Sequence, residues 1–237
     1  MTKQILLAGA AAMLAALPAS AITQAPADGT IANYAITATD MSGLHFGLLG
    51  RFGNRTVEYN GFEGELKLSR GGVYLGYDAL RWFTIFGFAG VAETKSDDFG
   101  LDGDTAVTFG GGAWAYLIDN DQLDVMSTFS RFRVNLGGSY AFTDSNELFL
   151  GEAEGFLTFE LLNDTFFSND IFPASIGLFA GPVFSYLHGD DVEQDVDDAW
   201  GVTVGLTMTF SRRTYASAGM DVFADDNVVY ASAGVRF

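Results

Sequence analysis

Apolar side chains alternate with small or hydroxyl side chains along most of the chain after residue 22. Residues 200–211 show this most clearly, since Val202 and Val204 fall on one face while Thr203 and Thr207 fall on the other. Successive side chains of a β-strand point to opposite faces, so the alternation predicts strands with two different surroundings. The polar face of a soluble sandwich strand usually carries Lys, Glu or Gln, whereas small hydroxyl residues suit the crowded interior of a small barrel.

The charge and the hydrophobicity of the chain point to a membrane rather than to nucleic acid. The formal net charge is −18, yet 49% of the residues are hydrophobic and 22 are phenylalanine. A nucleic-acid-binding surface is basic, so this charge argues against nucleic acid as a partner. Acidity and hydrophobicity coexist when apolar residues face lipid and acidic residues lie in water. The chain has no cysteine, which excludes disulfides and thiolate metal sites.

The first residues predict export. Lys3 provides a short positive start, residues 5–17 are apolar and uncharged, and Ala19-Ser20-Ala21 resembles a cleavage site. This order is typical of a secretory signal peptide, and the apolar run is shorter than the roughly 20 residues of a membrane-spanning helix. We therefore expect residues 1–21 to be a signal peptide. Residues 22–42 show weak patterning and are expected to be a periplasmic lead-in segment, with a short plug as the lesser alternative.

Residues 43–237 are expected to form an all-β, antiparallel, up-and-down transmembrane barrel. We expect ten strands, because barrels of this kind have an even number, although eight and twelve remain open. SRGG at residues 69–72 is interpreted as a bulge or kink within one long strand, whose first half projects beyond the bilayer. The expected strands are 43–53, 61–79, 83–93, 104–117, 122–134, 147–162, 174–188, 199–211, 213–222 and 228–237. Short turns, including residues 118–122, alternate in this interpretation with longer polar connections, including residues 53–61, 94–104 and 135–146.

The C-terminal segment VVYASAGVRF, residues 228–237, places apolar side chains at every second position and ends on Phe237. This ending resembles the C-terminal strand of bacterial outer-membrane β-barrels. GGVYLGYDALRWFTIFGFAG, residues 71–90, likewise resembles the strand–turn–strand units of small porin-like outer-membrane proteins. The resemblance implies the outer membrane of a Gram-negative-type bacterium and contact with outer-membrane lipid and lipopolysaccharide. It also implies that the barrel-assembly machinery recognises the last strand, with Phe237 as the assembly signal.

Several charged and aromatic residues are expected to point into the barrel. An eight-stranded barrel already leaves an interior that side chains can fill, so ten strands favour a plugged or narrow lumen over a general-diffusion pore. Two roles stay open, namely a structural or loop-presenting barrel closed by salt bridges, and a narrow porin-like path. The predicted lumen-lining residues are Arg51, Trp114, Arg131, Arg133, Glu152, Glu154, Glu160 and Arg236.

The sequence gives little indication of catalysis, and we expect no catalytic residue, cofactor or specific metal site. His45 is expected to point inward as a structural residue, and His188 lies at the outer end of a strand before acidic residues. The alternative is an outer-membrane enzyme with a site at the outer rim, of the omptin type or a lipid-modifying hydrolase. Residues 94–104 and 189–198 are acidic. They predict at most weak divalent-cation binding, since neither has the fixed ligand spacing of an EF-hand.

Overall fold

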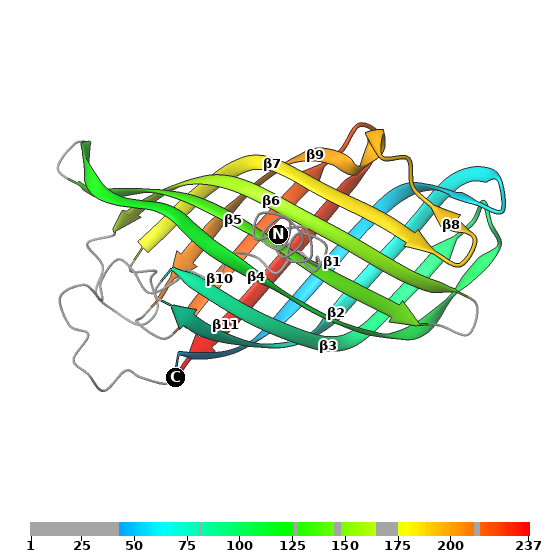
Figure 1. The fold of residues 1–237 in the computed structure, drawn as a ribbon, viewed down its shortest axis with the longest axis horizontal. Coiled ribbons are helices and arrows are strands. Elements are labelled where there is room, and N and C mark those ends of the chain that lie inside the picture. The colour runs from blue at the N-terminus through cyan, green and yellow to red at the C-terminus, as the bar shows by residue number, and fades with distance from the viewer. Residues whose placement is uncertain (1–42, 81, 126–127, 145–147, 165–174, 211–213) are drawn as a thin grey trace, which may run out of the picture.

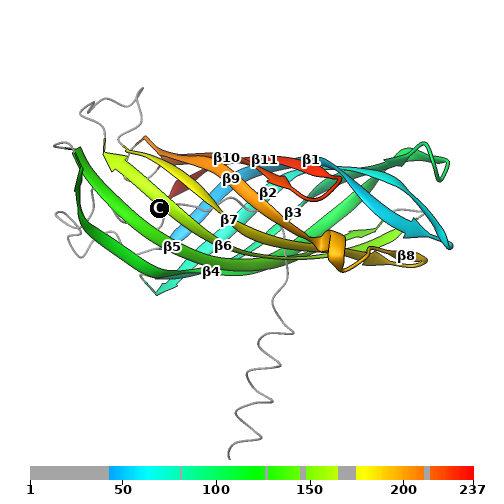
Figure 2. The ribbon, with the colours of Figure 1, turned by 90° about the horizontal axis from the view of Figure 1, so that it is seen from above.

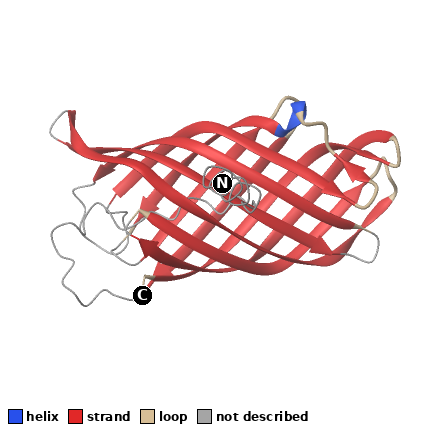
Figure 3. Ribbon diagram, viewed as in Figure 1, coloured by secondary structure: helices blue, strands red, loops and turns tan. Residues whose placement is uncertain are grey.

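The chain forms one closed antiparallel β-barrel (Figures 1 and 3). The computed structural model describes residues 43–237 except 81, 126–127, 145–147, 165–174 and 211–213. The predicted signal peptide and lead-in segment therefore lie outside the described residues. The strands are β1 (Leu44–Tyr59), β2 (Phe62–Leu80), β3 (Phe83–Ser96), β4 (Leu101–Val125), β5 (Thr128–Asp144), β6 (Phe149–Asp164), β7 (Ser175–Gly189), β8 (Val192–Glu193), β9 (Trp200–Thr209), β10 (Thr214–Val222) and β11 (Asn227–Arg236).

Ten of these strands make the barrel wall, which confirms the predicted fold and strand number. The sheet order is β11-β10-β9-β7-β6-β5-β4-β3-β2-β1, and β1 pairs with β11 to close the ring. The short β8 is additional to this ring. A turned view shows the strands running obliquely along the barrel (Figure 2). Among the described residues, no helix is long and apolar enough to cross a membrane.

The predicted alternation is present in the lower part of the barrel, nearest Leu44 and Phe237. On β1, Leu48 and Phe52 are exposed on the outside, whereas His45 and Arg51 are buried inside. On β9, Val202 and Val204 are exposed while Thr203 and Thr207 are buried. The outer surface here is a band of apolar side chains, as a lipid-facing surface requires. Leu44 and Phe237 lie at the same end, which we assign to the periplasm, and the amide of Phe237 donates to the carbonyl of Leu44 at 2.9 Å.

Several strands continue well beyond this apolar band, and there the two faces exchange character. On β2, Val73 and Leu75 are exposed outward. Nearer the start of the same strand, Leu66 and Leu68 are buried inside while Lys67 faces outward. We call the part with apolar outside faces the lower tier and the part with apolar inside faces the upper tier. The interior of the upper tier is a cluster of Val57, Leu66, Leu68, Ala92, Ala106, Leu148, Leu150, Leu187 and Val192.

The upper tier has eight strands rather than ten. The described parts of β9, β10 and β11 stop at Trp200, Val222 and Asn227, so these strands do not reach the top of β1 and β7. There β8 fills the gap, because Glu193 pairs with Glu58 of β1 and with His188 of β7. An eight-stranded barrel is just wide enough for side chains to fill, and the apolar cluster fills this one.

The upper tier explains where the expected connections were wrong. The polar stretches at residues 53–61, 94–104 and 135–146 are mostly strand. In the first two, polar side chains such as Glu58 and Lys95 face water outside a ladder that continues, whereas in the third the polar Asn135, Ser139 and Thr143 are buried inside the barrel. Residues 60–61 form a tight turn with both residues at positive φ. Residues 69–72 lie inside β2 and pair in unbroken register with both neighbouring strands, so no bulge occurs there.

The expected turn at residues 118–122 is also wrong, since these residues belong to β4. A register shift between Tyr116 and Ile118 lets Leu117 and Ile118 both face outward, and the strand continues to Val125. The polar run that suggested a turn is retained in the strand because Asp119 pairs with Arg131 and Arg133 of β5.

Replacing Leu206 with arginine should destabilise the barrel by about 2–4 kcal/mol, the cost of a cation near the bilayer midplane. Leu206 lies on the outer face between Leu178 of β7 and Ala218 of β10. Thr207→Arg should give a different folding equilibrium, because Thr207 is buried inside the barrel beside Glu160. Both values are measurable by denaturant titration in lipid vesicles. Equal effects of the two substitutions would show that the register of β9 is wrong.

Candidate functional site in the barrel interior

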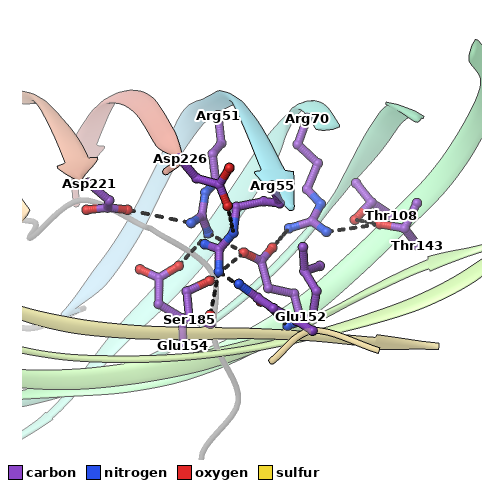
Figure 4. A network of polar contacts seen from close by, with 12 residues as sticks. Arg51, Arg55, Arg70, Thr108, Thr143, Glu152, Glu154, Ser185, Asp221 and Asp226 are labelled. Carbon is purple, nitrogen blue, oxygen red and sulfur yellow. Dashed lines mark hydrogen bonds and ion pairs between the residues drawn. The ribbon is translucent and has the colours of Figure 1, made fainter. Parts of the chain in front are cut away.

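Charged side chains from four strands meet in the interior, just below the upper tier (Figure 4). We call this group the ionic layer. Its members are all buried, and they carry two positive and three negative formal charges. They are Arg51 of β1, Arg70 of β2, Glu152 and Glu154 of β6, and Asp221 of β10. The alternation of each strand places them inside, because their neighbours in sequence face outward.

Arg51 is the centre of the ionic layer. Its Nη1 lies 2.9 Å from Oε1 of Glu152 and also forms an ion pair with Glu154, while its Nη2 lies 3.5 Å from Oδ2 of Asp221. Arg70 donates from Nη1 to Oε2 of Glu152 at 2.5 Å and from Nη2 to the Thr143 hydroxyl at 3.2 Å. Buried charges are tolerated only when they are paired and hydrogen-bonded, and these contacts provide that compensation.

A second polar group lies directly above the ionic layer, around Arg55 of β1. Its Nη2 donates to the carbonyl oxygen of Ser185 at 2.6 Å and to Oε1 of Gln194 at 2.9 Å. Its guanidinium also lies 4.0 Å from the ring centroid of Phe223, a cation–π distance. The Ser185 hydroxyl donates to Glu152 at 3.0 Å, so this group and the ionic layer are connected.

Below the ionic layer, bulky side chains fill the interior. Trp114 is buried and its ring centroid lies 5.0 Å from that of Phe86, and the hydroxyls of Tyr74 and Tyr215 are hydrogen-bonded to each other. This cluster comprises Leu49, Tyr74, Phe86, Phe88, Trp114, Tyr116, Ala141 and Tyr215. It occupies the inside of the lipid-facing tier, where an open pore would hold water.

The predicted lumen residue Arg236 lies at the periplasmic end rather than in the centre. Arg236 of β11 forms an ion pair with Asp78 of β2, which also lies 2.8 Å from Nε2 of His45. The Thr84 hydroxyl donates to the same carboxylate at 2.5 Å. Asp78 therefore connects β11, β1 and β2, the strands on both sides of the closing seam.

The predicted residues Arg131, Arg133 and Glu160 are buried in a separate polar group toward the periplasmic end. The two arginines bind the carboxylate of Asp119 at 3.5 and 3.2 Å. Glu160 accepts from the Thr207 hydroxyl at 2.5 Å. The structure thus divides the eight predicted residues among the ionic layer, the aromatic cluster, the seam and this group.

Sequence reasoning missed Arg55, Arg70, Asp221 and Gln194. Arg55 and Gln194 fall in stretches that were expected to be loops, and Arg70 falls in SRGG. The alternation itself indicated Arg70 and Asp221. Arg70 lies an even number of residues before the buried Tyr74 and so on the same inward face, and Asp221 lies between the outward Met220 and Val222. Gln194 gave no sequence signal, because its burial depends on how the segment after β7 folds back.

His188 faces outward at the upper end of β7, where its Nε2 lies 2.6 Å from the Tyr140 hydroxyl. Its ring stacks on Tyr186 with a centroid distance of 5.9 Å. Among the described residues, no group of three or more histidine, aspartate or glutamate side chains could hold a metal ion. The side chain of His188 thus belongs to an aromatic surface, and nothing in its contacts resembles a catalytic arrangement.

The closed ten-stranded wall, its apolar outer band and its side-chain-filled interior define an integral outer-membrane β-barrel protein. No protein-family model matches the chain, and no curated protein matches it. Solved structures with a similar arrangement include three outer-membrane proteins. An outer-membrane channel from Pseudomonas putida F1 is 11% identical with a TM-score of 0.42, over 91% of this chain and 100% of that one.

The other two structures are parts of autotransporters. The translocator domain of NalP from Neisseria meningitidis is 12% identical with a TM-score of 0.35, over 83% of this chain and 89% of that one. The transport unit of AIDA-I from Escherichia coli is 9% identical with a TM-score of 0.34, over 91% of this chain and 99% of that one.

Proposed function

We propose that this protein is a barrel closed by its own side chains, with a structural role in the outer membrane and at most a narrow path for small cations. The observation that supports this most strongly is the reach of Arg51. In the ring, β1 and β6 are five strands apart in either direction, so they face each other across the lumen. The ion pairs of Arg51 with Glu152 and Glu154 therefore span the barrel from wall to wall.

Layers on both sides of the ionic layer support the same proposal. The aromatic cluster with Trp114 and Tyr116 lies below it, and the apolar cluster of the upper tier lies above it. Opening a path would require the apolar cluster and the buried ion pairs to separate together. The side-chain contacts thus favour a stable envelope barrel over a diffusion pore. The alternative of an enzyme at the outer rim receives no support from the contacts of His188.

Purified protein in planar lipid bilayers should show either no channels or small ones, well below those of large trimeric porins. If small currents occur, they should favour cations, because carboxylates outnumber arginines in the ionic layer and acidic rings select cations in other pores. Replacing Glu152 and Glu154 together with glutamine should weaken this preference. A large, anion-selective conductance would contradict both the closed barrel and the role of these glutamates.

Contacts outside the chain remain part of the proposal. The apolar band would lie against outer-membrane lipid, and the acidic upper tier would stand among lipopolysaccharide headgroups. Weak bridging of acidic residues to lipopolysaccharide phosphates by divalent cations stays a prediction, as does recognition of Phe237 by the assembly machinery.

A further inference from the structure

The segment that completes the wall of the upper tier differs from the rest of that wall. Residues 190–199, which we call the strap, contain β8 and the short 3₁₀ helix Asp197–Ala199. The strap closes the gap above β9, β10 and β11, so the apolar cluster and Arg55 lie behind it. If the strap moved away, the interior above the ionic layer would open to the outside water.

A short ladder and a few further backbone hydrogen bonds hold the strap in place. The amides of Asp190 and Gln194 donate to the carbonyl oxygens of Phe149 and Leu187, and the amide of Asn60 donates to the carbonyl oxygen of Asp191. The two strand residues of the strap pair with Glu58 and Tyr59 on one side and with His188 and Gly189 on the other. By contrast, β1 pairs with β2 over its whole length. Most strap side chains are acidic or exposed, and those buried are Val192, Gln194 and Ala199. Segments with few buried side chains and short ladders are those that open locally at low cost.

Gln194 joins the strap to the barrel interior. Its side chain is 1% exposed, and its Oε1 accepts hydrogen bonds from Nη2 of Arg55 at 2.9 Å and from the amide of Leu187 at 3.0 Å. A hydrogen bond between a neutral acceptor and a buried guanidinium is among the stronger polar contacts. Loss of this acceptor would weaken the attachment of the strap without changing any strand of the ring.

Open space lies immediately outside Gln194. A hollow of about 400 Å³ at the upper rim is lined by Gln194, Val57 and five carboxylates from β1, β2 and the strap. On the inner side of Gln194, Arg55 is buried, and its Nη1 has no hydrogen-bond partner among the described residues. The side chain of Gln194 thus separates the outside hollow from the buried guanidinium of Arg55, which has N–H groups without an acceptor among the described residues.

We propose that the strap is a gate, held shut by the hydrogen bond between Gln194 and Arg55. Its opening exposes the buried polar group around Arg55 and Ser185 to water at the outer face, while the ionic layer below stays closed. The gate thus rests on the proposed function, because it gives access to this polar group and not to a path through the membrane.

The test uses the absence of natural cysteine. Ser185→Cys places a single thiol at a fully buried position behind the strap, since Ser185 is 0% exposed. Folded protein in lipid vesicles is treated with a membrane-impermeant cationic methanethiosulfonate, and the rate of thiol modification is measured. In the Ser185→Cys background, Gln194→Ala should speed modification about tenfold or more, as loss of a hydrogen bond to a charged group implies.

Two controls make the result specific. Gln194→Glu keeps an acceptor for Arg55 and should leave the rate near that of Ser185→Cys alone. Cysteines at the paired positions Glu58 and Glu193, once oxidised to a disulfide, should return the Gln194→Ala protein to the slow rate, because directly paired strand positions suit a disulfide. Folding of each variant is checked by heat-modifiable migration.

An equal modification rate in folded Gln194→Ala and its parent would overturn the gate, as would fast modification that persists after cross-linking. Neither result changes the conductance of the protein without substitutions, which tests the closed barrel separately. A large conductance with slow thiol modification would instead contradict the proposed function while the strap still covers Ser185.

Discussion

Replacement of Arg51 by methionine should lower the free energy of unfolding by about 3–5 kcal/mol, the cost of removing one partner from a buried ion pair. Arg51 is the shared partner of Glu152, Glu154 and Asp221, and all three carboxylates are buried. Without it, Glu154 loses its ion-pair partner and the layer keeps a surplus of negative charge. Denaturant titration in vesicles, followed by heat-modifiable migration, gives the difference directly.

A compensated variant distinguishes the loss of charge balance from the loss of packing. Adding Glu154→Gln to Arg51→Met removes the carboxylate left without a partner, so it should recover a substantial part of the lost stability. Buried ion pairs can often be replaced as a unit with little net cost. An effect of Arg51→Met below about 1 kcal/mol, the value typical of an exposed ion pair, would show that the ionic layer is hydrated and open.

Deletion of Phe237 should reduce the amount of folded barrel in the outer membrane severalfold and increase periplasmic aggregates or degradation products. Phe237 extends the outward row of Val229 and Val235, and its side chain is exposed. It therefore adds little to the packing of the finished barrel, and we propose that its role lies in recognition during assembly. Immunoblots of membrane fractions, with and without heating, measure the folded protein.

Phe237→Trp keeps an aromatic side chain at the last position and should assemble at nearly the normal level. Purified protein lacking Phe237 should still refold in vesicles with little loss of stability, since the side chain is exposed on the finished barrel. Unchanged outer-membrane levels after the deletion would contradict an assembly role. A large loss of stability in vitro would indicate a structural role instead.

The lower tier could be predicted from the sequence because one rule governs it. Where the outside is lipid and the inside holds small or polar side chains, as on β9, the positions of the apolar residues alone give the strand and its register, as the buried Thr203 and Thr207 show. The same rule placed Glu152 and Glu154 inside. Their partners were harder to assign, because contacts across the lumen join strands that are far apart in the chain, such as β1 and β6.

Apart from the projecting first half of β2, the upper tier was not predicted, for a physical reason. Outside the membrane its outward residues are polar, so residues 53–61 and 94–104 have the composition of loops although their backbones largely continue the ladder. The burial of Gln194 and the pairing of β8 depend on the gap left by the short strands β9, β10 and β11. A gap of that kind exists only in three dimensions and leaves no local pattern.

The exchange of faces along β2 also fixes how deep the barrel sits in the membrane. Within four residues, from Ser69 to Gly72, the outward positions change from Lys67 and its charged neighbours to Val73 and the apolar row that follows. A barrel displaced toward the periplasm would carry Lys67 into the hydrocarbon layer. A barrel displaced away from the periplasm would expose Val73 to water. The exchange of faces therefore fixes the level at which the outer surface of the bilayer meets the barrel, and a bilayer of different thickness must adjust at the periplasmic side.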